Sequence, residues 1–171
     1  MKPNAPRNMI LAALMAALAA ALTAYAHLPV PASNGAYVHL GDSAIYLAAC
    51  LLPTPWAALA GAVGGGLADV LGGFASWAPA TLAIKACMTL MFSAKRPTIF
   101  CGRNVLALLP AALINGAGYY LYESLLIKGS GWAGALANVP GNVIQSVGSA
   151  ALFVMMALAL DRLKIKGRMG L

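Results

Sequence analysis

Charged residues are scarce in this chain of 171 residues: they make up 9% of it, and only four are acidic. A soluble domain normally carries about a quarter charged residues. Apolar residues reach 61% and the mean hydropathy is +0.81. These values exclude a water-soluble enzyme, a nucleic-acid-binding protein and a disordered tail. They indicate an integral membrane protein with a single transmembrane domain over residues 1–171.

The sequence also lacks the patterns that mark metal, nucleotide and catalytic sites. Cys50, Cys87 and Cys101 form no CxxC pair, so we interpret them as packing residues. The glycines at 64–66 are not followed by lysine, which excludes a phosphate-binding P-loop. Neither HExxH nor GxSxG occurs. We therefore expect no enzymatic activity, no metal and no cofactor.

Six apolar runs predict six transmembrane helices, because a spanning helix needs about 20 apolar residues and closes its own backbone hydrogen bonds in lipid. The runs cover roughly 8–26, 39–53, 55–73, 77–93, 104–127 and 138–161. The second run is short, which fits a tilted or partly re-entrant helix as well as a straight span. The predicted fold is an all-α bundle of six transmembrane helices.

The basic residues gather at the ends of these runs, as cytoplasmic loops require. With the N-terminus inside, one orientation places nine of them in the cytoplasm: Lys2, Arg7, Lys95, Arg96, Arg103, Arg162, Lys164, Lys166 and Arg168. Lys128 then falls outside and Lys85 lies within a run. We expect a multi-pass protein of the cell membrane with both termini cytoplasmic.

The first run has a second interpretation. Its basic start, its alanine-rich core and Ala24-Tyr25-Ala26 match a signal peptide with an A-x-A cleavage site. Cleavage would leave five helices in the same orientation. We favour a retained helix because the run is long for a signal core. A purified protein whose sequence begins at His27 would contradict this choice.

Small residues line two of the runs. In lipid, helices associate mainly through close approach at such residues. Gly61, Gly65 and Ala68 of the third run predict packing inside the bundle. The alanine surface of the first run covers more than one face, which suggests a second membrane protein as partner. The candidate docking residues are Ala12, Ala13, Ala16, Ala17 and Ala20.

Lys85 is the most informative residue. It follows Trp77 by eight positions, about 12 Å along a helix, near the middle of a hydrocarbon core about 30 Å thick. A lysine there costs roughly 2.5–3.5 kcal/mol and needs a partner or a ligand. Asp69, at comparable depth on the neighbouring helix, is the obvious partner. A structural Lys85–Asp69 ion pair and a ligand contact both remain open.

Polar stripes on three runs point toward the same outer half of the bundle. Their helical spacing puts each stripe on one face, and rings and amides together suit a small polar aromatic ligand. The segment at 35–42 would cover this region from outside. The candidate ligand-binding residues are Tyr37, His39, Asp42, Trp77, Thr81, Lys85, Asn115, Tyr119, Glu123, Asn138, Asn142 and Gln145. Ser149 continues the last stripe.

Three segments resemble the substrate-binding S components of energy-coupling factor (ECF) vitamin transporters. They are Tyr-Val-His-Leu-Gly-Asp at 37–42, Ala-Gly-Ala-Val-Gly-Gly-Gly-Leu-Ala-Asp at 60–69 and Trp-Ala-Pro-Ala-Thr-Leu-Ala-Ile-Lys at 77–85. The resemblance covers most of the chain. It is to the riboflavin-type branch, which also contains proteins for pyrimidine precursors and pyridoxine-like vitamins.

This resemblance implies a membrane-embedded subunit that binds a small vitamin or vitamin precursor for uptake. It further implies that Ala12 and Ala16, or their neighbours, dock on a transmembrane coupling subunit powered by two cytoplasmic ATPases. The resemblance does not indicate which ligand this chain binds, because members of the branch bind different molecules. Two alternatives remain: a structural or assembly protein with a dry interior, and a solitary proton-coupled carrier, which the few deep titratable groups disfavour.

Overall fold

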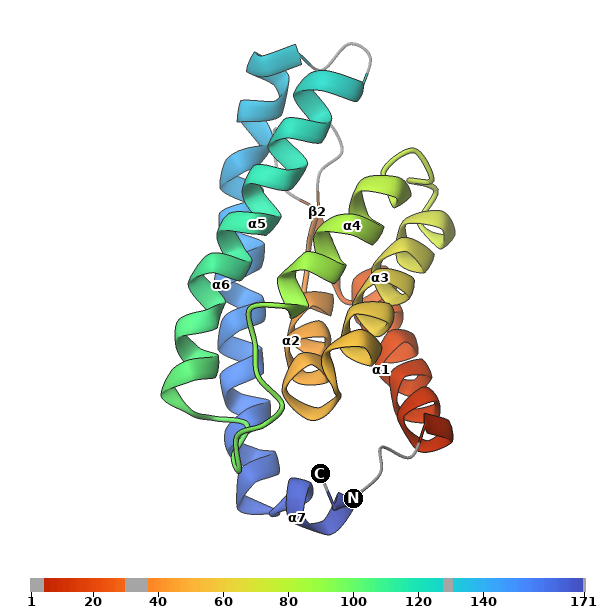
Figure 1. The fold of residues 1–171 in the computed structure, drawn as a ribbon. Helices are drawn as coiled ribbons and strands as arrows, with labels where there is room; N and C mark the ends of the chain where they lie inside the picture. The colour runs from red at the N-terminus through yellow and green to blue at the C-terminus, as the bar shows by residue number, and fades with distance from the viewer. Residues whose placement is uncertain (1–4, 30–36, 128–130, 171) are drawn as a thin grey trace.

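The computed structural model describes residues 5–29, 37–127 and 131–170. Seven helices and two short strands follow one another in these ranges (Figure 1). They are α1 (Ala5–Tyr25), β1 (His27–Pro29), β2 (Tyr37–His39), α2 (Gly41–Leu51), α3 (Thr54–Leu71), α4 (Ala78–Thr89), α5 (Gly102–Leu126), α6 (Gly131–Arg162) and α7 (Ile165–Met169).

Each of the six apolar runs forms a helix, and within the described residues α1, α5 and α6 are long and apolar enough to cross a membrane. The described part of the chain is thus almost entirely helical, with three candidate spans. α2 and α4, with 11 and 12 residues, fall short of the length that a crossing needs. α6 begins at Gly131 rather than near residue 138, because apolar residues continue the helix before Asn138, and it passes through Pro140.

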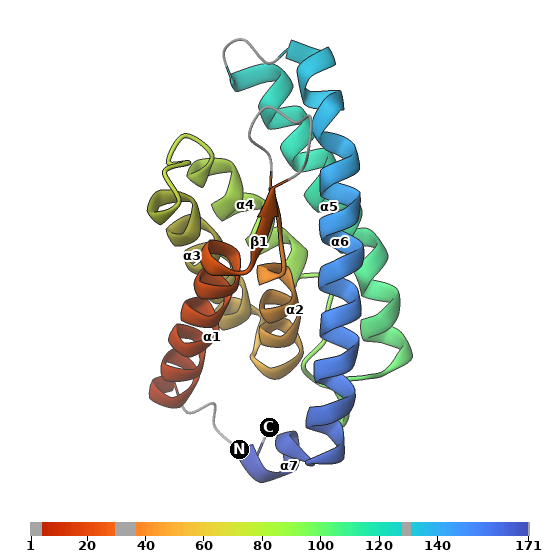
Figure 2. The ribbon, with the colours of Figure 1, turned by 180° about the vertical axis from the view of Figure 1, so that it is seen from behind.

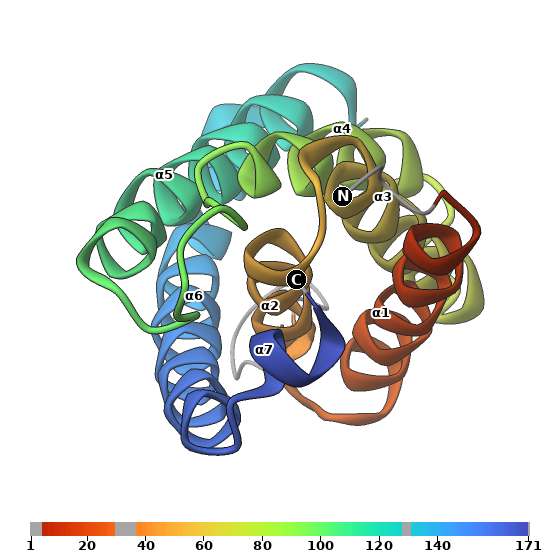
Figure 3. The ribbon, with the colours of Figure 1, turned by 60° about the horizontal axis from the view of Figure 1, so that its bottom comes forward.

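The short helix α2 occupies the centre of the molecule. Seen from one end, α1, α3, α4, α5 and α6 follow one another around it (Figure 3). Every residue of α2 is buried, including Asp42 in its first turn. At 1.5 Å per residue this helix is only about 16 Å long. Its neighbours therefore cover it on all sides, and its polar residues face protein.

A two-stranded antiparallel hairpin connects α1 to α2. Leu28 pairs with Val38 in the middle of its register. Strand β2 contacts α6, and Figure 2 shows the hairpin between α1 and α6. The hairpin thus places the start of α2 against both helices. Its two strands lie at the ends of the break that the sequence predicted between the first two runs, and β2 extends to His39 of the second run.

The glycines of α3 let two helices approach it closely. A Cβ on Gly64 would come within 2.7 Å of the Ala16 carbonyl oxygen of α1. A Cβ on Gly65 would come within 2.8 Å of Thr81 Cγ2 and 2.9 Å of Lys85 Cγ on α4. Adjacent glycines therefore allow close approach on two different sides of α3. For Gly65, the predicted role in packing within the bundle is confirmed.

The alanines of α1 divide between two faces. Ala12, Ala16 and Ala20 are buried, and Ala16 packs on Gly64 of α3. The prediction that these three alanines dock on a partner is therefore wrong, because this face of α1 packs against the small residues of α3 inside the bundle. Ala13 and Ala17 lie on the exposed face of the same helix.

One end of the molecule, here called the basal end, brings together the start of α1, the connection 90–101 and α7. Asp161 accepts hydrogen bonds from the backbone of Ile99 at 2.9 Å and Phe100 at 2.7 Å. Lys166 Nζ donates to two carbonyl oxygens of the same connection, at 2.9 and 2.8 Å. Arg7 donates to the Met169 carbonyl. Exposed basic residues surround this end: Lys95, Arg96, Arg103, Arg162, Lys164 and Arg168.

Candidate functional site

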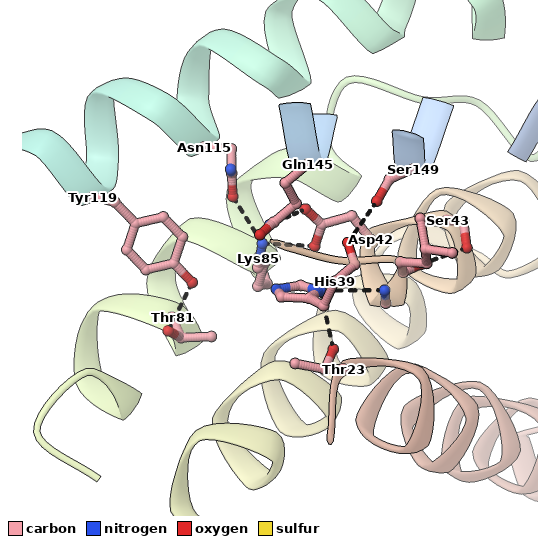
Figure 4. Close-up of polar contacts among 12 residues, drawn as sticks. Thr23, His39, Asp42, Ser43, Thr81, Lys85, Asn115, Tyr119, Gln145 and Ser149 are labelled. Carbon is pink, nitrogen blue, oxygen red and sulfur yellow. Dashed lines mark hydrogen bonds and ion pairs between the residues drawn. The ribbon is translucent and has the colours of Figure 1, made fainter. Parts of the chain in front are cut away.

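Four helices place a polar side chain in the interior around Lys85 (Figure 4). Lys85 Nζ of α4 lies 2.6 Å from Asp42 Oδ1 of α2. It also donates to Asn115 Oδ1 of α5 at 2.7 Å. Gln145 of α6 donates to Asp42 Oδ2 at 3.0 Å. We call these four residues the Lys85 cluster. Their exposed fractions are between 0% and 4%, so the ion pair is shielded from solvent and lipid.

The predicted Lys85–Asp69 ion pair is wrong, because Asp42 takes its place. Lys85 passes over Gly65, which has no side chain to stop it, and reaches the central helix α2. Asp69 lies beside Thr81, within electrostatic range of Lys85 but unpaired with it. Its Oδ2 is buried without a hydrogen-bond partner in the described part of the chain.

The facing sides of α4 and α5 form a ladder of three contacts. Lys85 meets Asn115 at its deep end. One turn further, Thr81 Oγ1 and the Tyr119 hydroxyl lie 2.8 Å apart. At the third level, the Trp77 ring lies 5.9 Å from the Tyr122 ring and 6.4 Å from the Tyr119 ring, centre to centre. The two predicted stripes therefore face each other, because helices with the same four-residue repeat run antiparallel here.

Two further predicted positions come together beyond this ladder. Asn138 of α6 donates to Glu123 Oε2 of α5 at 2.9 Å. Glu123 is buried, whereas Asn142 is half-buried and makes none of these contacts. The side chain of Tyr37 lies outside the described residues, so that prediction is not placed.

His39 is buried and ties three elements together. Its Nδ1 accepts a hydrogen bond from the Gly41 backbone at 3.2 Å and lies 3.4 Å from Thr23 Oγ1. Ser149 Oγ donates to its carbonyl oxygen at 3.3 Å. It therefore fixes the start of α2, and with it Asp42. Thr23 was absent from the predicted site. The only feature of the sequence that could have indicated it is a single hydroxyl residue near the end of an alanine-rich run.

The sequence matches the family of the ECF-type riboflavin transporter S component over residues 4–162. The chain belongs to this family. It is also 33% identical, over 126 residues, to a protein of Pyrococcus woesei described as an uncharacterized protein in gap 3'region. That match covers 73% of this chain and 82% of the relative. S components are the substrate-binding subunits of vitamin-type transporters that work with ECF modules, and they are not enzymes.

In this S component, three buried polar atoms besides Asp42 Oδ1 have no hydrogen-bond partner within the described residues. They are Asp69 Oδ2, Asn115 Nδ2 and Asn138 Oδ1. A buried polar atom left unpaired costs about 1–3 kcal/mol. These atoms lie on three helices, in or next to the ladder of α4 and α5. They are free to pair with donors and acceptors of a bound molecule.

Proposed function

We propose that this S component binds a small water-soluble vitamin or vitamin precursor at the Lys85 cluster and the adjoining ladder. The observation that carries the proposal is the set of unpaired polar atoms around the half-buried rings of Trp77 and Tyr119. A bundle held only by its own contacts would leave these atoms paired or replace them with apolar groups. Trp77 and Tyr119 supply stacking area, and the amides supply orientation.

In the proposed arrangement, α1 to α6 form the membrane bundle and the basal end faces the cytoplasm. The exposed basic residues at that end support this orientation, because such residues stay on the cytoplasmic side. The site then lies in the outer half, where a ligand enters from outside. Uptake uses a transmembrane coupling subunit and two cytoplasmic ATPases.

Ligand binding is tested with the purified protein in detergent and a panel of B-vitamins and their precursors. Trp77 should report binding through quenched fluorescence, because it packs on Tyr119 and Tyr122. Trp132 is 54% exposed, so Trp132→Phe should leave the quench intact and Trp77→Phe should remove it. A panel without any response, in fluorescence or in melting temperature, would contradict the proposal.

A structural role without ligand is the second candidate. The Lys85 cluster favours it in one respect, since Lys85 and Asp42 neutralise each other and Gln145 holds Asp42. This role predicts no retained small molecule. Native mass spectrometry of the detergent-purified protein separates the two: a bound vitamin supports uptake, and a bare chain supports the structural role.

A further inference from the structure

The lysines and arginines of the described chain gather at one end of the molecule. With the exception of Lys85, all of them lie at the basal end, which α7 crosses (Figure 3). Those exposed there are Lys95, Arg96, Arg103, Arg162, Lys164 and Arg168. Of the four acidic residues in the chain, only Asp161 lies at this end. Among the described residues, none of the exposed basic side chains forms a salt bridge, so the basal end presents a strong positive charge.

The connection 90–101 holds Lys95 and Arg96 in a fixed position. The buried Lys166 Nζ donates to the carbonyl oxygens of Ala94 and Arg96, at 2.9 and 2.8 Å. Both carboxylate oxygens of Asp161 accept from backbone N–H groups of the same connection, at 2.9 and 2.7 Å. The backbone that carries the exposed cations is therefore ordered before any partner arrives. Binding of an anion then has to order only side chains, which lowers its entropic cost.

Exposed apolar side chains adjoin the basic ones. Leu163 stands between Arg162 and Lys164 in the chain and is 52% exposed. Leu106, one helical turn after Arg103 on α5, is 74% exposed. A soluble anion would leave these leucines in water, whereas a phospholipid offers an anionic group and acyl chains together. Long basic side chains beside apolar ones are suited to that boundary, because their stems stay among apolar groups while their charges reach the headgroups.

We propose that the basal end is a binding surface for anionic phospholipids. The exposed ammonium and guanidinium groups bind the lipid phosphates, and the arginines can donate two parallel hydrogen bonds to one phosphate. The neighbouring leucines contact the acyl chains. Each Lys or Arg near an anionic membrane surface strengthens the attraction about fivefold. This inference goes beyond vitamin binding, because it requires neither a ligand at the Lys85 cluster nor a coupling subunit.

The test compares two lipids with the same short acyl chains, dihexanoyl phosphatidylglycerol and dihexanoyl phosphatidylcholine. Each is titrated into the full chain in a neutral detergent, and native mass spectrometry and melting temperature give its affinity. We expect phosphatidylglycerol to bind at least about tenfold more tightly at low salt, and the gap to narrow at high salt, which screens exposed charges. Equal affinities overturn the inference. Equal stabilisation by glycerol phosphate, which has no acyl chains, would assign the surface to a soluble anion and overturn it as well.

Neutral variants test which residues produce the lipid preference. Lys95→Gln with Arg96→Gln changes the connection 90–101, and Arg162→Gln with Arg168→Gln changes the ends of α6 and α7. Each double variant should reduce the preference for phosphatidylglycerol at least about fivefold. Lys128→Gln, which falls between α5 and α6 in the sequence, is the control and should leave it unchanged.

Because the four changed side chains are exposed, both double variants should melt near the unmodified protein in phosphatidylcholine. If one of them does not fold, the other still tests the surface. An unchanged lipid preference in a folded double variant, or an equal reduction by the control, overturns the inference.

Discussion

At the residue scale, the arrangement of the helices in the interior depends on which carboxylate forms an ion pair with Lys85. Asp42 belongs to a helix that is buried over its whole length, so its charge cannot escape to water if the lysine is lost. Breaking a buried pair by removing one partner costs far more than removing both. The pair therefore couples the position of the central helix to that of α4.

The first prediction separates this structural role from ligand binding. Lys85→Met leaves Asp42 as an isolated buried charge and should lower the free energy of unfolding by about 3–5 kcal/mol. Lys85→Met combined with Asp42→Asn should regain most of that stability, yet it should still bind no ligand. Melting in detergent and Trp77 fluorescence measure the two effects. If Lys85→Met alone is as stable as the unmodified protein, the prediction is contradicted.

The second prediction concerns Gly65. Gly65→Ala would press a methyl group against Thr81 and Lys85, at 2.8 and 2.9 Å, and push α4 away from α3. We expect a loss of about 1–3 kcal/mol in stability, together with weaker ligand binding. Gly116→Ala on α5 is the matched control, since its Cβ would meet nothing within 4 Å. Equal melting temperatures for the two variants would refute the proposed close approach.

Several residues of the site could be predicted from the sequence, because helical spacing alone brings Thr81 and Lys85, or Asn115 and Tyr119, onto one face. The ion-pair partner of Lys85 could not be predicted from the sequence. Periodicity describes one helix at a time, whereas the Lys85–Asp42 contact depends on α2 lying at the centre of the bundle. Asp69 was the nearer acid along the chain, and only the three-dimensional arrangement excludes it.

At the scale of elements, hydropathy predicted where the helices lie but not what surrounds them. A fully buried helix and a lipid-facing one have the same apolar composition, so α2 resembled a short span. The same ambiguity affected α1: both of its faces carry alanines, so the sequence does not show which face packs inside the bundle. Gly64 decides between them, because it draws Ala16 inward and leaves Ala13 and Ala17 outside.

The third prediction uses this outer face of α1. Ala13→Trp and Ala17→Trp should abolish co-purification with a coupling subunit and its ATPases, because bulk at small residues prevents close approach of helices in lipid. Ligand binding by the isolated protein should stay unchanged. Leu14→Trp, at a residue already large and 57% exposed, is the control. A complex that survives both alanine substitutions would place the docking surface elsewhere.

At the scale of the whole molecule, the basal end joins three distant segments through a few polar contacts. Lys166 holds the connection 90–101, and Asp161 accepts from the backbone of the same connection. Burial lowers the pKa of Lys166 below its usual 10.5. The nearby Cys50 and Asp161 act in the opposite direction and raise it, but by less. The ammonium form is thus less favoured in the folded protein than in the unfolded chain.

The fourth prediction follows from the sign of that shift. Between the lowered pKa and 10.5, the unfolded chain still binds the proton that folded Lys166 has released. The contribution of Lys166 to stability should therefore rise with pH across this window and fall as pH drops through the lowered pKa. Melting of the protein and of Lys166→Gln, compared from neutral pH upward, measures it. A constant difference between the two would contradict the shift.

The central position of α2 also has a consequence for biosynthesis. Asp42 contacts Gln145, which follows it by 103 residues. At typical rates of about 5–20 residues per second, the ribosome needs roughly 5 to 20 s to make that stretch. Throughout this interval α2 lacks its contact with α6, the last of its neighbours to be made. The complete burial of α2 can therefore be reached only after α6 has been made.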